Sequence, residues 1–150
     1  EVTPDRVIVH MAGNAMRLRA RVLKAELAVG QIALGQKLLR YTRMLLAMTG
    51  RTGACNKLHS LEQQLARWLL TMNDYVNGSL QLTHELIGLT LGVRRAGISV
   101  TANSFRTSGM IDYHRGDIRV IDRKGLEAIA CECYQIIKEE YDHLYADLSK

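Results

Sequence analysis

The sequence predicts a mainly α-helical fold with a small β component, on three observations. Residues 31–55 lack Pro and repeat apolar side chains at alternating spacings of four and three. Residues 83–108 read as two short helices separated by a Gly, and residues 110–121 alternate around an Arg-Gly turn, as a β-hairpin does. Because 47% of the 150 residues are hydrophobic, the chain can bury a core and is not a disordered protein.

The N-terminal segment predicts two short strands and a helix. Residues 7–11 are a β-rich run, a Gly-Asn turn signal lies at 13–14, and residues 15–18 give the second strand. Two strands alone are marginally stable, so we expect their partner strands upstream of this chain. Residues 19–28 then predict a short helix that ends near Gly30.

Residues 31–54 predict a helix about 36 Å long. One apolar row follows a heptad pattern and consists of Leu34, Leu38, Tyr41, Leu45 and Met48, continued more weakly by Thr52 and Cys55. A second row lies beside it and consists of Ile32, Leu39 and Leu46. Two interpretations follow: a core helix of a bundle, or a dimerisation helix that pairs with a second copy through one row and is covered by its own chain on the other.

Residues 60–82 predict a further core helix, a loop and a short extended stretch. Ser60 can cap the helix, which runs to about Asn73. Its apolar face comprises Leu61, Leu65, Trp68, Leu69 and Met72. An Asn-Gly-Ser loop at 77–79 leads into the extended residues 80–82.

The next segment has the spacing of a helix-turn-helix. Thr83 is a good N-cap, small Gly88 allows a close helix crossing, and Gly92 ends the first helix. A second helix begins near Arg94, and its inward face is Ile98, Thr101 or Ala102, and Phe105. Two short helices that cross steeply around a three-residue turn require these residue types at these positions.

A β-hairpin directly after the second helix predicts a winged helix. In it, Ile111 and Tyr113 pair with Ile118 and Val120 across the turn. Asp122 then caps one C-terminal helix, which packs through Leu126, Ile129, Cys133, Ile137 and Leu144.

Several classes of site and protein are not expected. The three cysteines, Cys55, Cys131 and Cys133, have no C-x-x-C or zinc-finger spacing, so we expect no metal site, no disulfide framework and a reducing, cytoplasmic location. We interpret Cys131 and Cys133 as core residues. The five His residues are scattered and no phosphate-binding Gly-rich loop occurs, so an enzyme is not expected. No apolar run is long enough to span a membrane.

The stretches LHSLEQQLARWLLTMND, LTHELIGLTLGVRRAGISVTANSFRTSGMIDYHRGDIRVID and GLEAIACECY resemble the C-terminal part of Crp/Fnr-type bacterial transcription regulators. The resemblance covers nearly the whole chain and is strongest at 58–134. It implies three parts: the end of a cyclic-nucleotide-binding-type sensor β-roll at 1–28, a dimerisation helix at 29–57, and a winged helix-turn-helix DNA-binding domain at 58–150.

The resemblance also implies partners and a mode of control. A homodimer would form through residues 31–55, bind a palindromic site on double-stranded DNA and act with RNA polymerase. No cofactor is expected in this chain, and a small-molecule effector, a cyclic nucleotide or another compound, would bind the sensor barrel.

The resemblance assigns DNA contacts to single residues. Arg95 matches a family position that reads a base, with Arg94 as a second reader or a phosphate contact. Thr83 matches a phosphate contact. At two positions where relatives often carry Glu and Arg, this sequence has Ala96 and Val100. Ala96 offers only a small contact surface, and Val100 is a candidate for contact with a thymine methyl group. The remaining candidates are Ser99 and Asn103 on the same helix face and His114 and Arg115 at the wing tip.

Net charge discriminates weakly between the two functions that the sequence supports. The chain has a formal charge of +5, but most of the excess lies in residues 1–59 and the segment 60–120 is close to neutral. The first function is sequence-specific DNA binding by a homodimeric regulator. The alternative is a dimeric winged-helix module that binds protein and not DNA. Positive potential around Arg94, Arg95 and the wing would favour DNA.

Overall fold

The computed structural model describes residues 9, 13–76 and 78–148, which form seven helices and one small sheet. The helices are α1 (Ala20–Ala28), α2 (Ile32–Leu58), α3 (Leu61–Tyr75), α4 (His84–Leu91), α5 (Arg95–Thr107), α6 (Arg123–Ile129) and α7 (Cys133–Leu148). The strands are β1 (Leu80–Gln81), β2 (Ile111–His114) and β3 (Asp117–Val120). The predicted class, mainly α with a small β component, is therefore confirmed.

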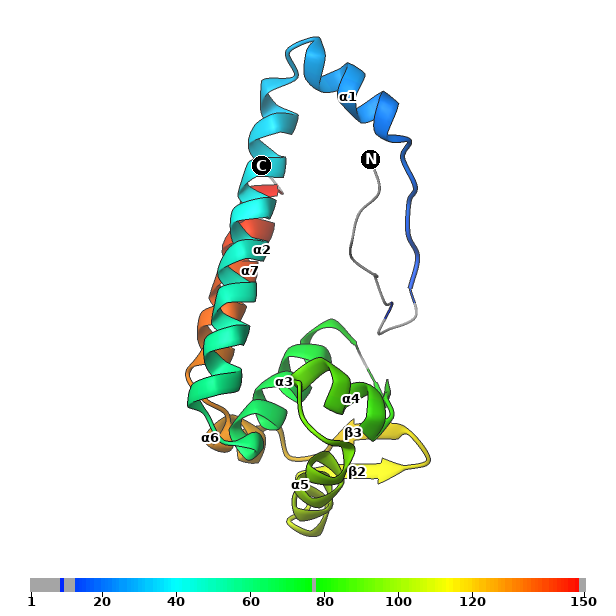
Figure 1. The fold of residues 1–150 in the computed structure, drawn as a ribbon, viewed down its shortest axis with the longest axis vertical. Helices are drawn as coiled ribbons and strands as arrows, with labels where there is room; N and C mark the ends of the chain where they lie inside the picture. Colours follow the sequence, from blue (N-terminus) through cyan, green and yellow to red (C-terminus); the bar gives the residue numbers. More distant parts are fainter. Residues whose placement is uncertain (1–8, 10–12, 77, 149–150) are drawn as a thin grey trace.

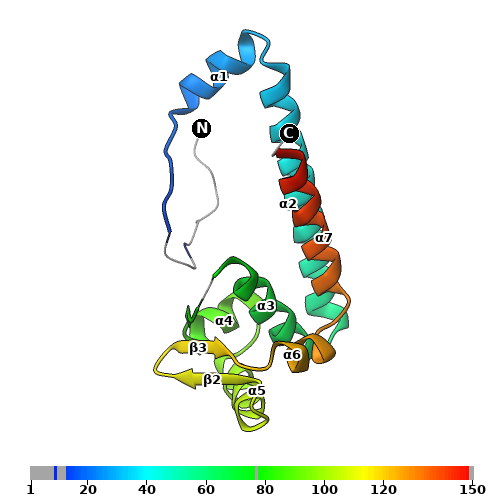
Figure 2. The same ribbon diagram turned by 180° about the vertical axis from the view of Figure 1, so that it is seen from behind.

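The molecule consists of a long two-helix rod with a compact winged helix at one end. Helix α7 runs back along α2, while α3 to α6 and the sheet gather below them and α1 lies at the opposite end of the rod (Figures 1 and 2). None of the helices in the described part of the chain is long and apolar enough to span a membrane.

The N-terminal segment differs from the predicted hairpin. The first predicted strand, residues 7–11, lies almost entirely outside the described residues, and residues 15–18 are not in a strand. The predicted short helix is present as α1. Gly30 lies between α1 and α2 and has a positive φ of 82°.

Helix α2 has 27 residues, so it is about 40 Å long and extends four residues beyond its predicted end. Its own chain covers it, but not through the predicted second row. Helix α7 packs on the face that contains Met44, which is 2% exposed, and Leu144 of α7 is buried beside it. Ile32, Leu39 and Leu46 remain 69–73% exposed.

The C-terminal helix predicted to continue from Asp122 is two helices. Asp122 caps α6 as expected, since its carboxylate accepts a hydrogen bond from the Gly125 N–H at 2.9 Å. Helix α6 ends at Ile129 and α7 begins at Cys133, because Ala130 adopts an extended ψ of 144°. The helical periodicity continues across this break in the sequence, which is why it predicted a single helix.

The core lies between α3, the two helices of the helix-turn-helix and the sheet. Ser60 and Gln63 form a capping box that starts α3, as the sequence predicted for Ser60. The fully buried large side chains are Phe105, Leu65, Leu69, Leu70, Leu80, Leu82, Ile87, Leu91, Ile98, Ile111, Ile118 and Leu126. The strand order is β1-β3-β2, with Ile111 opposite Val120 and Tyr113 opposite Ile118, so the predicted hairpin register is confirmed.

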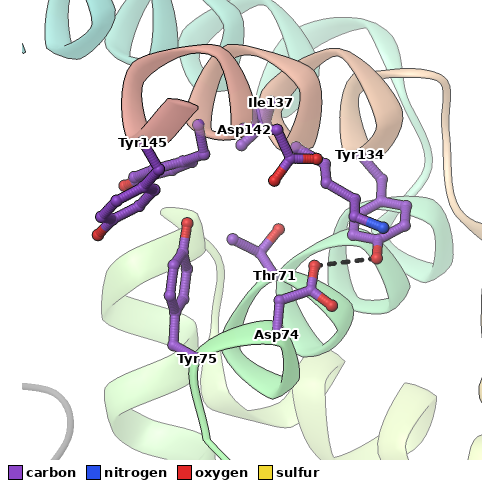
Figure 3. Close-up of a pocket in the computed structure, with 9 residues that line it drawn as sticks. Thr71, Asp74, Tyr75, Tyr134, Ile137, Asp142 and Tyr145 are labelled. Carbon is purple, nitrogen blue, oxygen red and sulfur yellow. Dashed lines mark hydrogen bonds between the residues drawn. The ribbon is translucent and has the colours of Figure 1, made fainter. Parts of the chain in front are cut away.

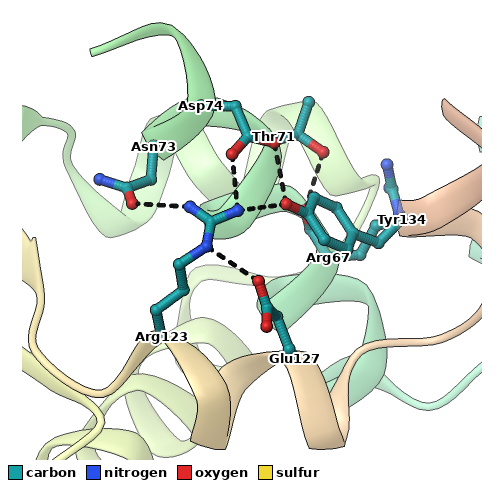
Figure 4. A network of polar contacts seen from close by, with 7 residues as sticks. All are labelled: Arg67, Thr71, Asn73, Asp74, Arg123, Glu127 and Tyr134. Atoms are coloured by element: carbon teal, nitrogen blue, oxygen red, sulfur yellow. Dashed lines mark hydrogen bonds and ion pairs between the residues drawn. The ribbon is translucent and has the colours of Figure 1, made fainter. Parts of the chain in front are cut away.

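A polar network joins α6 and α7 to the C-terminal end of α3 (Figure 4). The Arg123 guanidinium donates to Asn73 Oδ1 at 3.2 Å, Asp74 Oδ1 at 2.7 Å and Glu127 Oε1 at 2.8 Å, and it also contacts the Tyr134 hydroxyl. Tyr134 in turn donates to Asp74 Oδ2 at 2.9 Å. Because one guanidinium serves three helices, the network fixes how α6 leads into α7.

Candidate nucleic-acid interface

Helix α5 presents one face to the core and the opposite face to solvent. Ile98, Thr101, Ala102 and Phe105 are all buried, in agreement with the predicted inward face. Five of the six residues predicted to contact DNA from this helix and its N-cap are exposed: Arg94, Arg95, Ala96, Val100 and Asn103. Within the described part of the chain, no carboxylate lies within ion-pair distance of Arg94 or Arg95. Their charge is therefore available to a partner.

A close crossing of α4 and α5 sets the position of this face. A Cβ atom on Gly88 would lie 2.9 Å from the Val93 carbonyl oxygen and 3.4 Å from the Arg95 backbone nitrogen, so only Gly fits. Gly92 ends α4 in the left-handed conformation, with φ 68°. The backbone at the start of α5 therefore rests directly on α4.

Ser99, predicted to contact DNA, also forms hydrogen bonds within the protein. Its hydroxyl donates to the Arg95 carbonyl at 3.1 Å and lies 2.9 Å from His84 Nδ1. Because the hydroxyl proton is used toward Arg95, we assign the second bond as donation from His84 Nδ1–H. Ser99 thus links α5 to α4 and is only half-exposed.

His84 and Tyr113 are two site residues that the sequence analysis missed. The two rings stack at a centroid distance of 4.3 Å, and His84 Nε2 is buried without a partner among the described residues. Burial, and then the nearby charge of Arg95, lower the pKa of His84, so its ring is neutral near pH 7. The position of His84 as the first residue of α4 is the feature of the sequence that could have indicated its place in this site.

The N-terminus of α4, the start of α5 and the wing border one open depression of about 300 Å³. It is lined by Thr83, His84, Glu85, Arg95, Tyr113, Arg115 and Gly116. The Thr83 hydroxyl caps α4 by accepting from the Leu86 N–H at 3.2 Å. Three of the predicted contact residues, from three separate elements, are therefore brought together here: Thr83, Arg95 and Arg115.

The wing tip is a two-residue turn in which both residues have positive φ. Arg115 has φ 48° and Gly116 has φ 85°, the pattern of a type I′ hairpin turn. Gly adopts this conformation freely, whereas for Arg115 it costs roughly 1–2 kcal/mol. His114 and Arg115 are both exposed at the tip.

The residues predicted to mediate dimerisation are partly exposed along α2. Tyr41 and Leu45 are 48% and 41% exposed, while Leu34, Leu38 and Met48 are half-buried. The described part of the chain thus leaves an apolar side of α2 open.

A second cavity, of about 330 Å³, lies between α3 and α7, away from the α5 face (Figure 3). Tyr75 and Tyr145 flank one end of it, and Asp74 hydrogen bonds to Tyr134 at the other. Burial raises the pKa of the Tyr75 hydroxyl, and hydrogen bonding to Tyr141 adds to this. The lining combines these hydroxyl groups with the ionisable side chains of Asp74, Lys138 and Asp142.

The cysteines are close together in space, contrary to what their spacing suggested. Cys55, Cys131 and Cys133 are buried, as expected of core residues, but they converge with His59 into a group of four metal-ligating side chains. Burial, with a hydrogen bond to Cys55, raises the pKa of the Cys131 thiol to about 12. The spacing of these residues in the sequence gave no sign of this group.

Comparisons with known proteins agree with this architecture. Residues 63–129 match the family described as the Crp-like helix-turn-helix domain. FixK2 from Bradyrhizobium japonicum has a similar structure, with a TM-score of 0.67 and 20% identity over 74% of this chain and 59% of FixK2. A protein from Eubacterium rectale described as a transcriptional regulator of the Crp/Fnr family gives a TM-score of 0.55 and 27% identity over 73% of this chain and 51% of that protein. Comparison with curated proteins gives no match.

Proposed function

Because residues 63–129 form a Crp-like helix-turn-helix domain, we propose that the chain binds DNA as a transcription regulator, with α5 in the major groove. The observation that carries the proposal is the depression that gathers Thr83, Arg95 and Arg115 beside the exposed face of α5. The chain spans 59% of the length of FixK2, so the proposal concerns the dimerisation and DNA-binding parts of such a regulator.

Arg95 is the proposed base-reading residue. It is the first residue of α5, is exposed and has no ion-pair partner among the described residues. A guanidinium at the N-terminal end of a recognition helix can bond guanine O6 and N7 together. Val100 is 72% exposed on the same helix and supports a contact with a thymine methyl group. Arg94, Ala96, Ser99 and Asn103 complete the proposed reading face, and Ser99 also bonds to His84.

The proposed phosphate contacts flank this face. Thr83 stands at the N-terminus of α4, where the helix dipole favours an anion. His114 and Arg115 stand at the wing tip. Contacts of this kind orient the protein on the duplex without reading its sequence.

We further propose a homodimer through α2. Leu39 and Leu46 are about 70% exposed, and the hydroxyls of Thr42 and Thr49 bond back to α2 carbonyls at 2.9 and 2.8 Å. The side of α2 that carries Leu39 and Leu46 therefore exposes apolar side chains beside the predicted row of Tyr41 and Leu45, and a second copy of α2 can cover them. Two α5 helices would then lie about 34 Å apart and read a palindromic site. RNA polymerase and a small-molecule effector complete the proposal as further partners.

Selection of bound DNA from a random pool tests this function. We expect enrichment of a two-fold palindrome, with Arg95→Ala weakening specific binding by roughly 1–3 kcal/mol and relaxing one position in each half-site. Lys138→Ala, which removes the same charge from α7, is the control and should leave the selected sequence unchanged. Equal loss on specific and random DNA would reassign Arg95 to a phosphate contact. Absence of any enriched sequence would contradict the proposal and favour a protein-binding winged helix.

A further inference from the structure

Four potential metal ligands from three separate segments meet where the rod joins the winged helix. Cys55 lies near the end of α2, His59 follows that helix, Cys131 lies between α6 and α7, and Cys133 begins α7. Their ligand atoms all lie within 4.8 Å of one another. The three cysteines are free and at most 4% exposed, so the group is shielded from solvent.

The separations agree with the edges of a tetrahedral site. Cys55 Sγ lies 3.5 Å from Cys131 Sγ, and Cys133 Sγ lies 3.8 Å from His59 Nδ1. Zinc–sulfur bonds of about 2.3 Å and zinc–nitrogen bonds of about 2.0–2.1 Å give tetrahedral edges of about 3.8 Å and about 3.6 Å. The other pairs of ligand atoms lie within 4.8 Å of each other, so one ion can reach all four atoms once these pairs close by up to about 1 Å.

The orientation of His59 is that of a metal ligand. Its Nε2 lies 3.3 Å from Glu132 Oε1, while its Nδ1 faces the Cys133 sulfur. A carboxylate that accepts the Nε2 proton leaves the Nδ1 lone pair directed at the group of thiols. A carboxylate bonded to the far nitrogen of a ligating His is the usual outer partner at zinc sites.

The break between α6 and α7 gives independent support. In a continuous helix, residues two apart lie about 200° apart around the axis, so Cys131 and Cys133 would face opposite sides. In this structure both are buried in one cluster with Cys55. No Pro or Gly occurs between Ile129 and Tyr134 to interrupt the helix locally. A site that requires both thiols accounts for the interruption.

We propose that Cys55, His59, Cys131 and Cys133 bind one structural Zn²⁺ ion. Three sulfur ligands and one imidazole form a closed, four-coordinate set that leaves no position for a substrate. On binding, the three thiols release their protons to solvent as the zinc–sulfur bonds form, and no group is oxidised or reduced. A two-iron cluster fits less well, because two metal atoms hold their outer ligands farther apart than this group allows.

Metal analysis of the purified protein tests the proposal. After incubation with Zn²⁺ and dialysis, we expect one zinc per chain by inductively coupled plasma mass spectrometry. Co²⁺ in its place should give intense visible bands of tetrahedral geometry with thiolate charge transfer. His59→Ala and Cys133→Ser should each lose stoichiometric zinc. His59→Cys, which restores a fourth ligand, should retain it.

Two further variants separate ligation from packing. Glu132→Gln should weaken zinc binding by roughly 10–100-fold without abolishing it. His143→Gln, an exposed His of α7 outside the group, should leave it unchanged. Zinc content below one per ten chains, full zinc in the His59→Ala and Cys133→Ser variants, iron in place of zinc, or a Cys55–Cys131 disulfide by mass spectrometry would each overturn the proposal. The measurement uses no DNA, so it is independent of the proposed regulatory function.

Discussion

At the scale of single residues, Gly88 shows how one missing side chain positions the proposed DNA-reading helix. We predict that Gly88→Ala destabilises the fold by about 1–3 kcal/mol, because its Cβ would meet the Val93 carbonyl, a backbone atom that cannot turn away. Thermal denaturation measures the change. Gly50→Ala is the matched control, because a Cβ at Gly50 in α2 would meet nothing within 4 Å, and there helix propensity should raise stability. Equal effects at both positions would contradict this account of the crossing.

His84, which links α4 to α5, makes the stability of the fold depend on pH. Burial and the charge of Arg95 lower its pKa in the folded chain, whereas the unfolded chain keeps a value near 6.5. Below about pH 6.5 the unfolded chain therefore binds a proton that the folded chain does not. The free energy of unfolding consequently decreases as the pH is lowered.

We predict that this decline is smaller in His84→Gln than in the unchanged protein. The melting temperature, followed from pH 8 to pH 5, measures it. His143→Gln, which changes an exposed His, should retain the full decline. A decline of the same size in His84→Gln would show that His84 does not carry this dependence.

At the scale of elements, the wing carries a conformational cost at its tip. We predict that Arg115→Asn stabilises the fold by about 0.5–1 kcal/mol, since Asn tolerates positive φ better than Arg. The same change should weaken DNA binding and reduce the slope of log affinity against log salt by about 0.9 for each lost phosphate contact. An unchanged slope would show that Arg115 makes no phosphate contact. An unchanged melting temperature would show that the positive φ of Arg115 does not destabilise the fold.

The starts of α3, α4 and α6 were predictable because their capping signals are local. Ser60, Thr83 and Asp122 each cap the helix that the sequence assigned to them, and Gly92 ends α4 in the conformation expected of it. The break after Ile129 had no such local signal.

The groupings that the sequence missed depend on contacts between distant segments. Cys55 and Cys131 are 76 positions apart, so their proximity arises only when α7 folds back onto α2. The covering of Met44 by α7 and the link between His84 and Ser99 are tertiary in the same way. The nine predicted DNA contacts followed from helix faces and a resemblance, and the bond that Ser99 makes to His84 is a tertiary contact that neither of these predicts.

At the scale of the whole molecule, the open side of α2 determines the proposed assembly. We predict that Leu46→Glu weakens dimerisation more than 100-fold, because it would place a carboxylate in an apolar interface at a cost of about 3 kcal/mol or more. Sedimentation velocity should show the unchanged protein at about twice the chain mass of 16.9 kDa and the variant as a monomer. Gln36→Glu adds the same charge to an exposed position on α2 and should remain dimeric. A dimeric Leu46→Glu would place the interface elsewhere.

The return of α7 along α2 also has a mechanical consequence. The chain passes from α2 to the winged helix at residues 59–60 and comes back at residues 130–133, so the two parts are joined by two crossings and not by one. Twisting the winged helix about the first crossing would require α7 to slide along α2, which its buried contacts at Met44 and Leu144 resist. A rod about 40 Å long that moves as one unit acts as a lever: a tilt of about 5° about the α1 end moves the opposite end by about 3.5 Å. That displacement is comparable to the separation of neighbouring base pairs.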